Sequence, residues 1–349
     1  MSSNGSAEPE PEAESASEEK AYRVGMISIH LGMALAAVLL NLGVILRFMS
    51  KKELRRCLSV PYLLSLLYAS LVLGLIVPPI GAAGYFRGEH DDTIPSWLCN
   101  VTEYCSTLAL LAMSLSLVAH AIAIARKALF NHLSSTVYAL IFIWMVSICW
   151  SLGASLMSYD VIKVKSGDVI FSVCQPRNNK WAVYSHLHWI EFALFIACPV
   201  MLTFLINCLH CKHNENVARN VKEKQEPTDI GWNVDSTDED ESPWKMMKLS
   251  MLLLFTFVLC QIPIRVYYMV FYTVRHNAGG NMVIPEPEAE PESMAEMYSL
   301  NRPKDTDQMW RVVLLYLQMS QAVINPIVIL IVYRKDICSR GNNRVEIEY

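Results

Sequence analysis

The fold is decided by long apolar stretches, of which the third along the chain, Asn100–Ile124, reads NVTEYCSTLALLAMSLSLVAHAIAI. After its Glu103 this stretch contains no Asp, Glu, Lys or Arg. An α-helix rises about 1.5 Å per residue, so about 20 mostly apolar residues cross the roughly 30 Å hydrocarbon core of a bilayer. The stretch therefore predicts a membrane-spanning helix.

Six further stretches meet the same test: Val24–Phe48, Leu58–Ala83, Ser134–Tyr159, Tyr184–Leu209, Met246–Val274 and Met309–Tyr333. The composition agrees, because 53% of the 349 residues are hydrophobic and only 18% are charged, whereas soluble domains have roughly 25% charged residues. A disordered chain, a fibrous protein and an ordinary cytosolic enzyme are thereby excluded. The sequence predicts an all-α bundle of seven transmembrane helices over residues 24–333.

Polar segments flank and interrupt this domain. They are the acidic N-terminus 1–23, the loop 210–243 after the fifth span, the acidic loop 276–308 before the seventh, and the tail 334–349. Segments of such composition cannot bury a core, so the N-terminus and both loops are predicted to be disordered.

The orientation follows from the basic residues, which favour the cytoplasmic side of a membrane. The first connecting segment and its flanks carry five of them: Arg47, Lys51, Lys52, Arg55 and Arg56. This predicts an extracellular N-terminus, a multi-pass protein of the plasma membrane, and glycosylation of Asn4 in the sequon Asn4-Gly-Ser6. The net charge of −4 gives no broad basic surface, so nucleic acid is not an expected partner.

Several intramembrane motifs occur in a fixed order along the spans. They are Asn41 in the first, Arg126 at the end of the third, Trp144 in the fourth, Pro199 in the fifth, Phe257-Val-Leu-Cys260-Gln261-Ile-Pro263 in the sixth and Asn325-Pro326-Ile-Val-Ile329 in the seventh. In this order they resemble the rhodopsin-like (class A) G-protein-coupled receptors.

The resemblance implies a receptor that binds an extracellular ligand within the bundle and activates a heterotrimeric G protein when the sixth helix moves. It assigns the coupling and switch roles to Arg126, Asn325, Pro326, Pro263 and Asn41. It also implies a short cytoplasmic interfacial helix after the last span. The ligand class stays open between a peptide and a small molecule.

Other positions depart from the family pattern. The acidic partner expected before Arg126 is Ala125, and the aspartate expected in the second span is Ser70. Asn207, Gln261 and Ile329 stand where the family has aromatic switch residues. Loss of the acid beside Arg126 predicts raised basal activity if the receptor couples. An uncoupled seven-helix scaffold, decoy or heteromer partner is the alternative, and a transporter is a weaker one.

Two charged residues lie deeper within the predicted spans than the others, in a region where charges are costly and usually paired or functional. Glu191 precedes Pro199 by eight residues, and Arg265 follows Pro263 by two. In the class A arrangement both would face the central cavity, so we predict that they pair and bind the ligand, with a purely structural pair as the alternative. The further candidates for the same space are Gln261, Gln318, Tyr268, His188 and Tyr316.

The cysteines suggest modification rather than metal binding. The resemblance implies a disulfide between the start of the third span and Cys174, with Cys99 favoured over Cys105. Cys338, among basic residues after the last span, is a candidate for palmitoylation beside membrane lipid, with an unmodified cysteine as the alternative. Cys208-Leu-His210-Cys211 has no second ligand pair, so no metal or cofactor is expected. No set of nucleophile, base and orienting group predicts an enzyme.

Overall fold

The computed structural model describes residues 11–51, 59–87, 95–125, 133–156, 159–166, 169–176, 181–224, 243–279 and 305–338. Asn4, Arg126 and the tail after Cys338 lie outside these ranges, so the expectations for them concern residues that the structure does not describe.

The described helices are α1 (Pro11–Ser50), α3 (Val60–Arg87), α4 (Ser96–Ala125), α5 (Leu133–Ser155), α6 (Trp181–Glu191), α7 (Cys198–Lys224), α8 (Pro243–Gly279) and α10 (Asp305–Cys338). A π-helical segment, η3 (Phe192–Ala197), joins α6 to α7, so these three elements form one span. Seven helices are therefore long and apolar enough to cross a membrane within the described residues. The predicted seven-helix bundle is confirmed.

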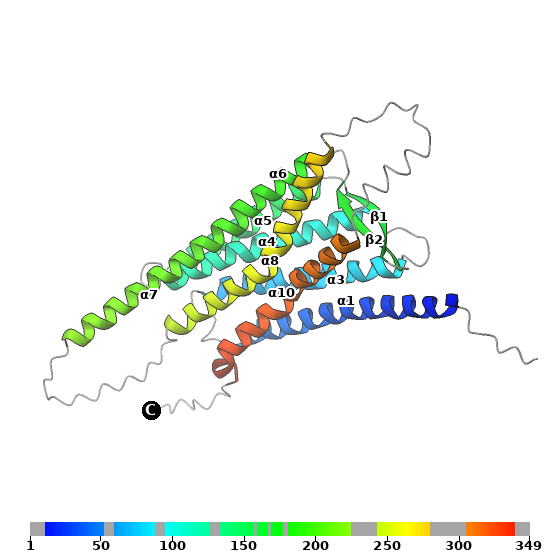
Figure 1. Ribbon diagram of the computed structural model, residues 1–349. Helices are drawn as coiled ribbons and strands as arrows, with labels where there is room; N and C mark the ends of the chain where they lie inside the picture. Colours follow the sequence, from blue (N-terminus) through cyan, green and yellow to red (C-terminus); the bar gives the residue numbers. More distant parts are fainter. Residues whose placement is uncertain are drawn as a thin grey trace, which may run out of the picture.

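The two ends of the bundle are distinguished by its connections (Figure 1). The start of α1 lies at the same end as a two-stranded hairpin, and α7 and α10 finish at the opposite end. We call these the outer and the inner end, respectively, as names for the two ends of the structure.

The hairpin was not predicted. Strands β1 (Tyr159–Ser166) and β2 (Val169–Pro176) pair antiparallel, with Tyr159 opposite Pro176. The predicted fourth span was too long, because α5 ends at Ser155 and Tyr159 already belongs to β1. Closely spaced β-branched residues, Val-Ile-Lys-Val in β1 and Val-Ile-Phe-Ser-Val in β2, favour extended backbone there.

Helices also extend into the segments whose composition predicted disorder. α1 begins at Pro11, α7 continues to Lys224, α8 continues to Gly279 and α10 begins at Asp305. Composition indicates only that such segments cannot build a core, whereas Ala, Glu and Lys are strong helix formers and can prolong a helix that the bundle has already nucleated. At the inner end α10 runs without interruption to Cys338, so the expected interfacial helix would fall in undescribed residues.

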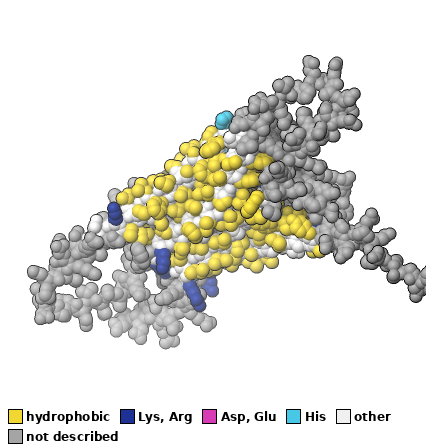
Figure 2. Space-filling view, viewed as in Figure 1, with side chains coloured by type: hydrophobic (Ala, Val, Ile, Leu, Met, Phe, Trp, Pro, Cys, Tyr) yellow, Lys and Arg dark blue, Asp and Glu magenta, His cyan; other side chains and the backbone are white. Residues whose placement is uncertain are grey.

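Large hydrophobic side chains cover the sides of the bundle and form an apolar belt between its ends (Figure 2). Tyr138, Phe142 and Met145 on α5 and Met201 on α7 are among those more than half exposed. The Lys and Arg side chains that are visible in this view lie at the inner end. An apolar belt with charge kept to its margin suits a protein surrounded by lipid.

Prolines lie within α3, α7, α8 and α10, and for Pro326 and Pro199 another helix supplies the missing donor. Proline has no N–H for the carbonyl four residues before it. Before Pro326 that carbonyl belongs to Ala322, and Asn41 Nδ2 of α1 donates to it at 2.7 Å. Before Pro199 it belongs to Phe195 in η3, and the Ser114 hydroxyl of α4 donates to it. The irregular backbone is thus stabilised from neighbouring helices, as a membrane interior requires.

Candidate functional site

A buried ion pair joins α6 to α8 in the outer half of the bundle. Arg265 Nη1 lies 3.0 Å from Glu191 Oε2, and the two residues are 3% and 0% exposed. The expected pairing of these two charges is present in the structure, although their expected role in ligand binding stays a prediction.

Three more side chains surround this pair. Trp150 Nε1 of α5 donates to Glu191 Oε1 at 3.1 Å, and His188 Nδ1 lies 3.3 Å from Glu191 Oε2. Tyr268 stacks on the His188 ring with 5.6 Å between the ring centres. We call these five residues from α5, α6 and α8 the outer cluster.

The position of the outer cluster depends on an irregular helix. Glu191 is the last residue of α6, directly before the π-helical turn η3, and Cys198 donates its N–H five residues back, to the Ala193 carbonyl. Single π-helical turns occur frequently at functional sites. Glu191 thus stands where the span changes its pitch, and it is held there by partners from α5 and α8.

The glutamines expected at the site contact other helices instead. Gln261 Nε2 of α8 donates to Gln321 Oε1 of α10, and Gln318 Nε2 of α10 donates to Ser106 Oγ of α4 at 3.0 Å. All three glutamines are almost completely buried. They line the bundle interior, as expected, but among the described residues no hydrogen bond joins them to Glu191 or Arg265.

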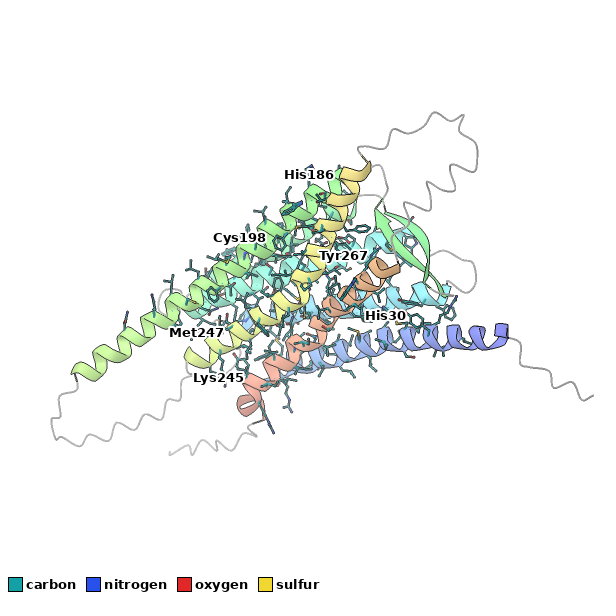
Figure 3. All side chains as sticks on the ribbon, viewed as in Figure 1. His30, His186, Cys198, Lys245, Met247 and Tyr267 are labelled. Atoms are coloured by element: carbon teal, nitrogen blue, oxygen red, sulfur yellow. A yellow bond between two sulfur atoms is a disulfide. The ribbon has the colours of Figure 1, made fainter. Side chains whose placement is uncertain are left out.

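Tyr316 lies in a different group from the one expected. Its hydroxyl is 2.7 Å from His30 Nδ1 of α1, and the His30 ring also lies 5.5 Å, centre to centre, from the Tyr85 ring of α3. His30 is buried and labelled in Figure 3 on α1. This group was not predicted from the sequence, although His30 lies inside the first predicted span, where an ionisable residue often marks a functional site.

Asn325, for which a switch role was predicted, belongs to a connected chain of polar contacts in the bundle interior. Asn325 Nδ2 donates to Ser70 Oγ of α3 at 3.0 Å, and Ser70 Oγ lies 3.5 Å from Met113 Sδ of α4. Thr256 Oγ1 of α8 donates to Asn325 Oδ1 at 3.4 Å. Ser70 therefore contacts Asn325 directly, and at Ser70 itself the site has a hydroxyl in place of the carboxylate that the resemblance leads one to expect.

A tyrosine that sequence reasoning did not single out joins three helices at the inner end. The Tyr333 hydroxyl of α10 donates to Met246 Sδ of α8 at 2.8 Å, and Lys245 Nζ lies 5.2 Å from the Tyr333 ring centre. Phe48 of α1 packs edge-on against the same ring. We call these four residues the inner cluster; Figure 3 labels Lys245 at this end of α8.

Asn207 of α7 also makes contacts near the inner end. Its Nδ2 atom donates to Ser250 Oγ of α8 at 3.0 Å and to the Thr203 carbonyl at 2.9 Å. The asparagine found where the family has an aromatic residue is therefore buried and bonded to the neighbouring helix.

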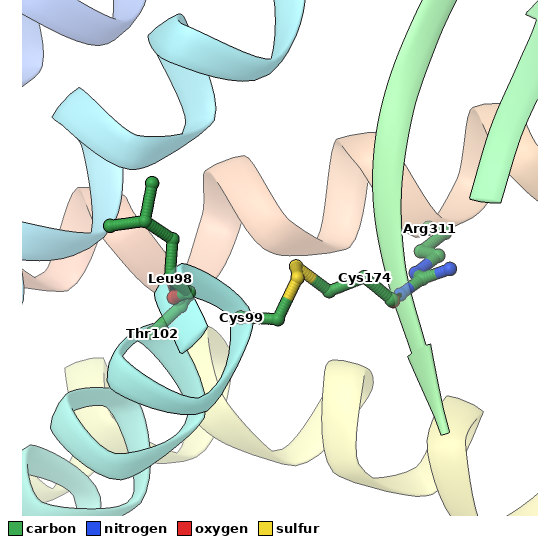
Figure 4. Close-up of a disulfide and its surroundings, with 5 residues drawn as sticks. All are labelled: Leu98, Cys99, Thr102, Cys174 and Arg311. Carbon is green, nitrogen blue, oxygen red and sulfur yellow. Dashed lines mark hydrogen bonds between the residues drawn. A yellow bond between two sulfur atoms is a disulfide. The ribbon is translucent and has the colours of Figure 1, made fainter. Parts of the chain in front are cut away.

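A disulfide joins Cys99 at the start of α4 to Cys174 in β2. Arg311 Nη2 of α10 donates to the Cys174 carbonyl at 2.6 Å, so the hairpin is linked to two helices (Figure 4). Cys105 is buried and free. The structure thus confirms the favoured pairing of Cys99 and excludes Cys105 as the partner of Cys174.

Two further predictions concern lipid attachment at Cys338 and the absence of a metal site. Cys338 ends α10, but its side chain is not among those described. Within the described residues, no group of three His, Cys, Asp or Glu side chains could hold a metal ion.

No curated protein matches this chain. Over residues 40–329, which is most of its length, the chain matches the family described as 7 transmembrane receptor (rhodopsin family). The matched range contains Glu191, Arg265 and Asn325. Together with seven helices of membrane length and the helix-to-hairpin disulfide, this match shows that the chain belongs to the rhodopsin family of 7-transmembrane receptors.

Proposed function

We propose that this receptor binds an extracellular ligand at the outer cluster and activates a heterotrimeric G protein through its inner end. The observation that carries the proposal is the ion pair between Glu191 and Arg265, which is buried and shared between α6 and α8. Charges inside a membrane bundle are costly and usually mark functional sites. A pair that joins two helices gives a ligand a direct way to change their relative position.

The transmission step in this proposal is a movement of α8. This helix contains Arg265 of the outer cluster, Pro263 and, at its inner start, Met246 of the inner cluster. A ligand shifts the population toward a state only if it binds that state more tightly. We propose that the ligand favours a state in which α8 bends about Pro263 and its inner end leaves Tyr333, exposing a surface for the G protein.

Several further features belong to the same proposal. The N-terminus lies outside the plasma membrane, with the hairpin and the outer cluster on that side, and Asn4 carries a glycan. Arg126 and Asn325 act as coupling residues, and Cys338 carries a lipid. The Lys and Arg side chains seen at the inner end in Figure 2 support this orientation, since basic residues favour the cytoplasmic side.

The test is basal and evoked G-protein activation measured with a panel of Gα biosensors. Wild type is compared with Arg126→Glu at matched surface expression, and with Lys51→Glu as a control that changes a basic residue directly after α1. A Gα signal that Arg126→Glu abolishes and Lys51→Glu preserves supports the proposal. A signal from wild type that Arg126→Glu leaves intact contradicts the assigned coupling residue.

A second candidate function is a receptor-like partner that does not couple to a G protein. It is favoured by the positions at which the family's switch residues are replaced. Asn207 is satisfied by Ser250, and Ser70 by Asn325, so both replacements have stable local partners. Absence of activation by every Gα, with normal surface expression and with binding at the outer cluster intact, would favour this second function. Membership of the receptor family favours both readings over a transporter.

A further inference from the structure

Two buried polar atoms of α8 have no hydrogen-bond partner among the described residues. One is Nε of Arg265, a donor, and the other is Oε1 of Gln261, an acceptor. Arg265 and Gln261 are 3% and 0% exposed. A buried donor or acceptor left without a partner costs about 1–3 kcal/mol, so each unsatisfied atom in a folded protein calls for an explanation.

The two atoms belong to side chains on the same face of the helix. Gln261 and Arg265 are four residues apart within α8, and residues at this spacing lie one above the other, with about 5–6 Å between their Cβ atoms. The unpaired donor of Arg265 and the unpaired acceptor of Gln261 therefore belong to neighbouring side chains on one side of α8. A single ligand group with one acceptor and one donor could satisfy both.

The charge of the outer cluster restricts that group further. Arg265 already contacts the Glu191 carboxylate at 3.0 Å, so the positive charge of the guanidinium is compensated. A ligand carboxylate would add an uncompensated negative charge beside Glu191, and a buried charge without a partner is strongly unfavourable. An ammonium group offers donors only and gives Arg265 Nε nothing to bind.

We propose that Arg265 and Gln261 form a subsite for a neutral carboxamide of the ligand. The carboxamide oxygen accepts from Arg265 Nε, and the carboxamide NH₂ donates to Gln261 Oε1. The Arg265–Glu191 pair stays intact and fixes the guanidinium, while the Gln261–Gln321 bond fixes the other amide. This inference rests on the proposed ligand site and specifies the chemical class that the site selects.

Aromatic rings near Arg265 suggest what adjoins the carboxamide. Tyr268 follows Arg265 by three residues, which places it on the same side of α8, and it stacks on the His188 ring with 5.6 Å between ring centres. Rings gain from offset or edge contacts with one another. A suitable probe therefore carries one phenyl ring and one primary carboxamide, as 3-phenylpropanamide does.

The test measures the thermal unfolding midpoint of the full-length purified receptor in lipid nanodiscs. The probes are 3-phenylpropanamide, 3-phenylpropanoic acid and methyl 3-phenylpropanoate, which share a shape and differ in charge and in the donor. A probe at about ten times its Kd should raise the midpoint by about 2–4 °C. We expect this shift for the carboxamide alone.

Two variants assign the shift to the named atoms. Arg265→Lys keeps a cation for Glu191 but has no Nε–H group, and Gln261→Leu removes the acceptor; each should abolish the carboxamide shift. Ser65→Ala is the control, because Ser65 is a buried polar residue that contacts Ser116 and Trp144 instead. If Arg265→Lys fails to fold, Gln261→Leu and the probe comparison still decide the question.

The outcomes are distinct from those of the coupling test, because the midpoint requires no G protein. An equal shift from the acid or the ester, no shift from the carboxamide up to its solubility limit, or a full shift in both variants would overturn the inference. A carboxamide-specific shift without activation of any Gα would leave it standing and count against coupling. N-acetylphenylalaninamide and the benzyl ester of N-acetylglutamine then distinguish a terminal from a side-chain carboxamide as the source.

Discussion

At the scale of single residues, the structure shows how this chain accommodates polar groups inside a membrane bundle. Glu191 has hydrogen-bond or ionic partners on α5, α6 and α8, and each proline-freed carbonyl described above has a donor from another helix. No water is present in the hydrocarbon core to form hydrogen bonds with such groups, so other residues of the bundle must provide their hydrogen-bond partners. Individual substitutions should therefore have effects that depend on which partner is left behind.

Replacement of Glu191 by Gln should destabilise the protein strongly. Arg265 would remain buried without its counter-charge, and breaking one side of a buried ion pair costs about 3–5 kcal/mol. The thermal unfolding midpoint in nanodiscs measures the effect. The double variant Glu191→Gln with Arg265→Met should recover most of the loss, whereas a double variant as unstable as the single one would show that the ion pair is not what Glu191 contributes.

Ser114→Ala should cost about 1–3 kcal/mol, because the Phe195 carbonyl before Pro199 loses its donor in a buried place. Ser28→Ala is the matched control, since Ser28 also donates to a carbonyl, that of Val24, but is exposed on the surface of α1. Its loss should be negligible. Equal unfolding midpoints for the two variants would contradict the assigned role of Ser114.

The contacts of single residues could be predicted from the sequence where the residue type is rare in membrane helices, and could not be predicted where the residue type is common there. A glutamate and an arginine inside apolar spans are unusual, so their pairing could be expected from the sequence alone. Ser114, Met246 and Tyr333 are ordinary residues of membrane helices. Only their neighbours on other helices give them a role, and a single sequence does not contain those neighbours.

At the scale of helices, close approach in the middle of the bundle depends on small residues. A Cβ atom added at Gly74 of α3 would overlap Ala37 of α1 and would lie 3.3 Å from Ala322 of α10. Both neighbours are alanines, which have no flexible end that could move aside. Small residues at such contacts are typical of membrane helix packing.

Gly74→Ala should therefore separate α1 from α3 and lower the unfolding midpoint, at a cost of about 1–3 kcal/mol for overpacking. Gly43→Ala is the control, since nothing lies within 4 Å of the added Cβ atom there. It should be neutral or slightly stabilising, because alanine favours a helix over glycine. A loss as large for Gly43 as for Gly74 would show that the contact with Ala37 is not the cause.

The inner cluster makes a prediction about helix movement. Tyr333→Ala removes the hydroxyl bond to Met246 and the ring contacts with Phe48 and Lys245. If these contacts favour the closed inner end by about 1.4 kcal/mol, their loss raises the open population about tenfold. Basal Gα activation should rise accordingly, and less so in Tyr333→Phe, which keeps the ring.

Tyr138→Ala serves as the control for Tyr333, because Tyr138 lies on α5 and is 72% exposed on the apolar belt. All variants are compared at equal surface expression, so that a folding defect does not pass for a change in activity. A Tyr333→Ala receptor that reaches the surface with wild-type basal activity would contradict the proposed role of the inner cluster.

The elements themselves were predictable to different degrees. The spans could be located to within a few residues because a bilayer imposes both length and apolarity. The hairpin β1–β2 could not, since its strands were assigned to a loop or to the end of the fourth span. The extensions of α1 and α7 were missed because composition indicates whether a segment can form a core, and a helix protruding from a bundle does not need one.

At the scale of the whole molecule, three groups of contacts lie at successive levels along the bundle, and α8 contributes a residue to each of them. The outer cluster includes Arg265 of α8, the chain through Asn325 includes Thr256, and the inner cluster includes Met246. Pro263 lies between the first level and the second. A movement of α8 would therefore alter all three, which is what a receptor that reports an outer event at its inner face requires.

In the proposed function, the inner end of α8 moves when a G protein binds. The most direct measurement is the distance between spin labels at Arg47→Cys on α1 and Lys248→Cys on α8, in a receptor whose other cysteines except Cys99 and Cys174 are replaced. Both labelled positions are exposed. A pair at Arg47→Cys and Arg334→Cys, on the helices α1 and α10 that Asn41 joins, is the control.

A nucleotide-free heterotrimeric G protein should shift the Arg47–Lys248 distance distribution to longer values and leave the Arg47–Arg334 distribution unchanged. Tyr333→Ala should populate the longer distance before any G protein is added. An Arg47–Lys248 distribution that stays unchanged with every heterotrimer of the Gα panel would contradict the proposed movement of α8 and favour the uncoupled receptor-like partner.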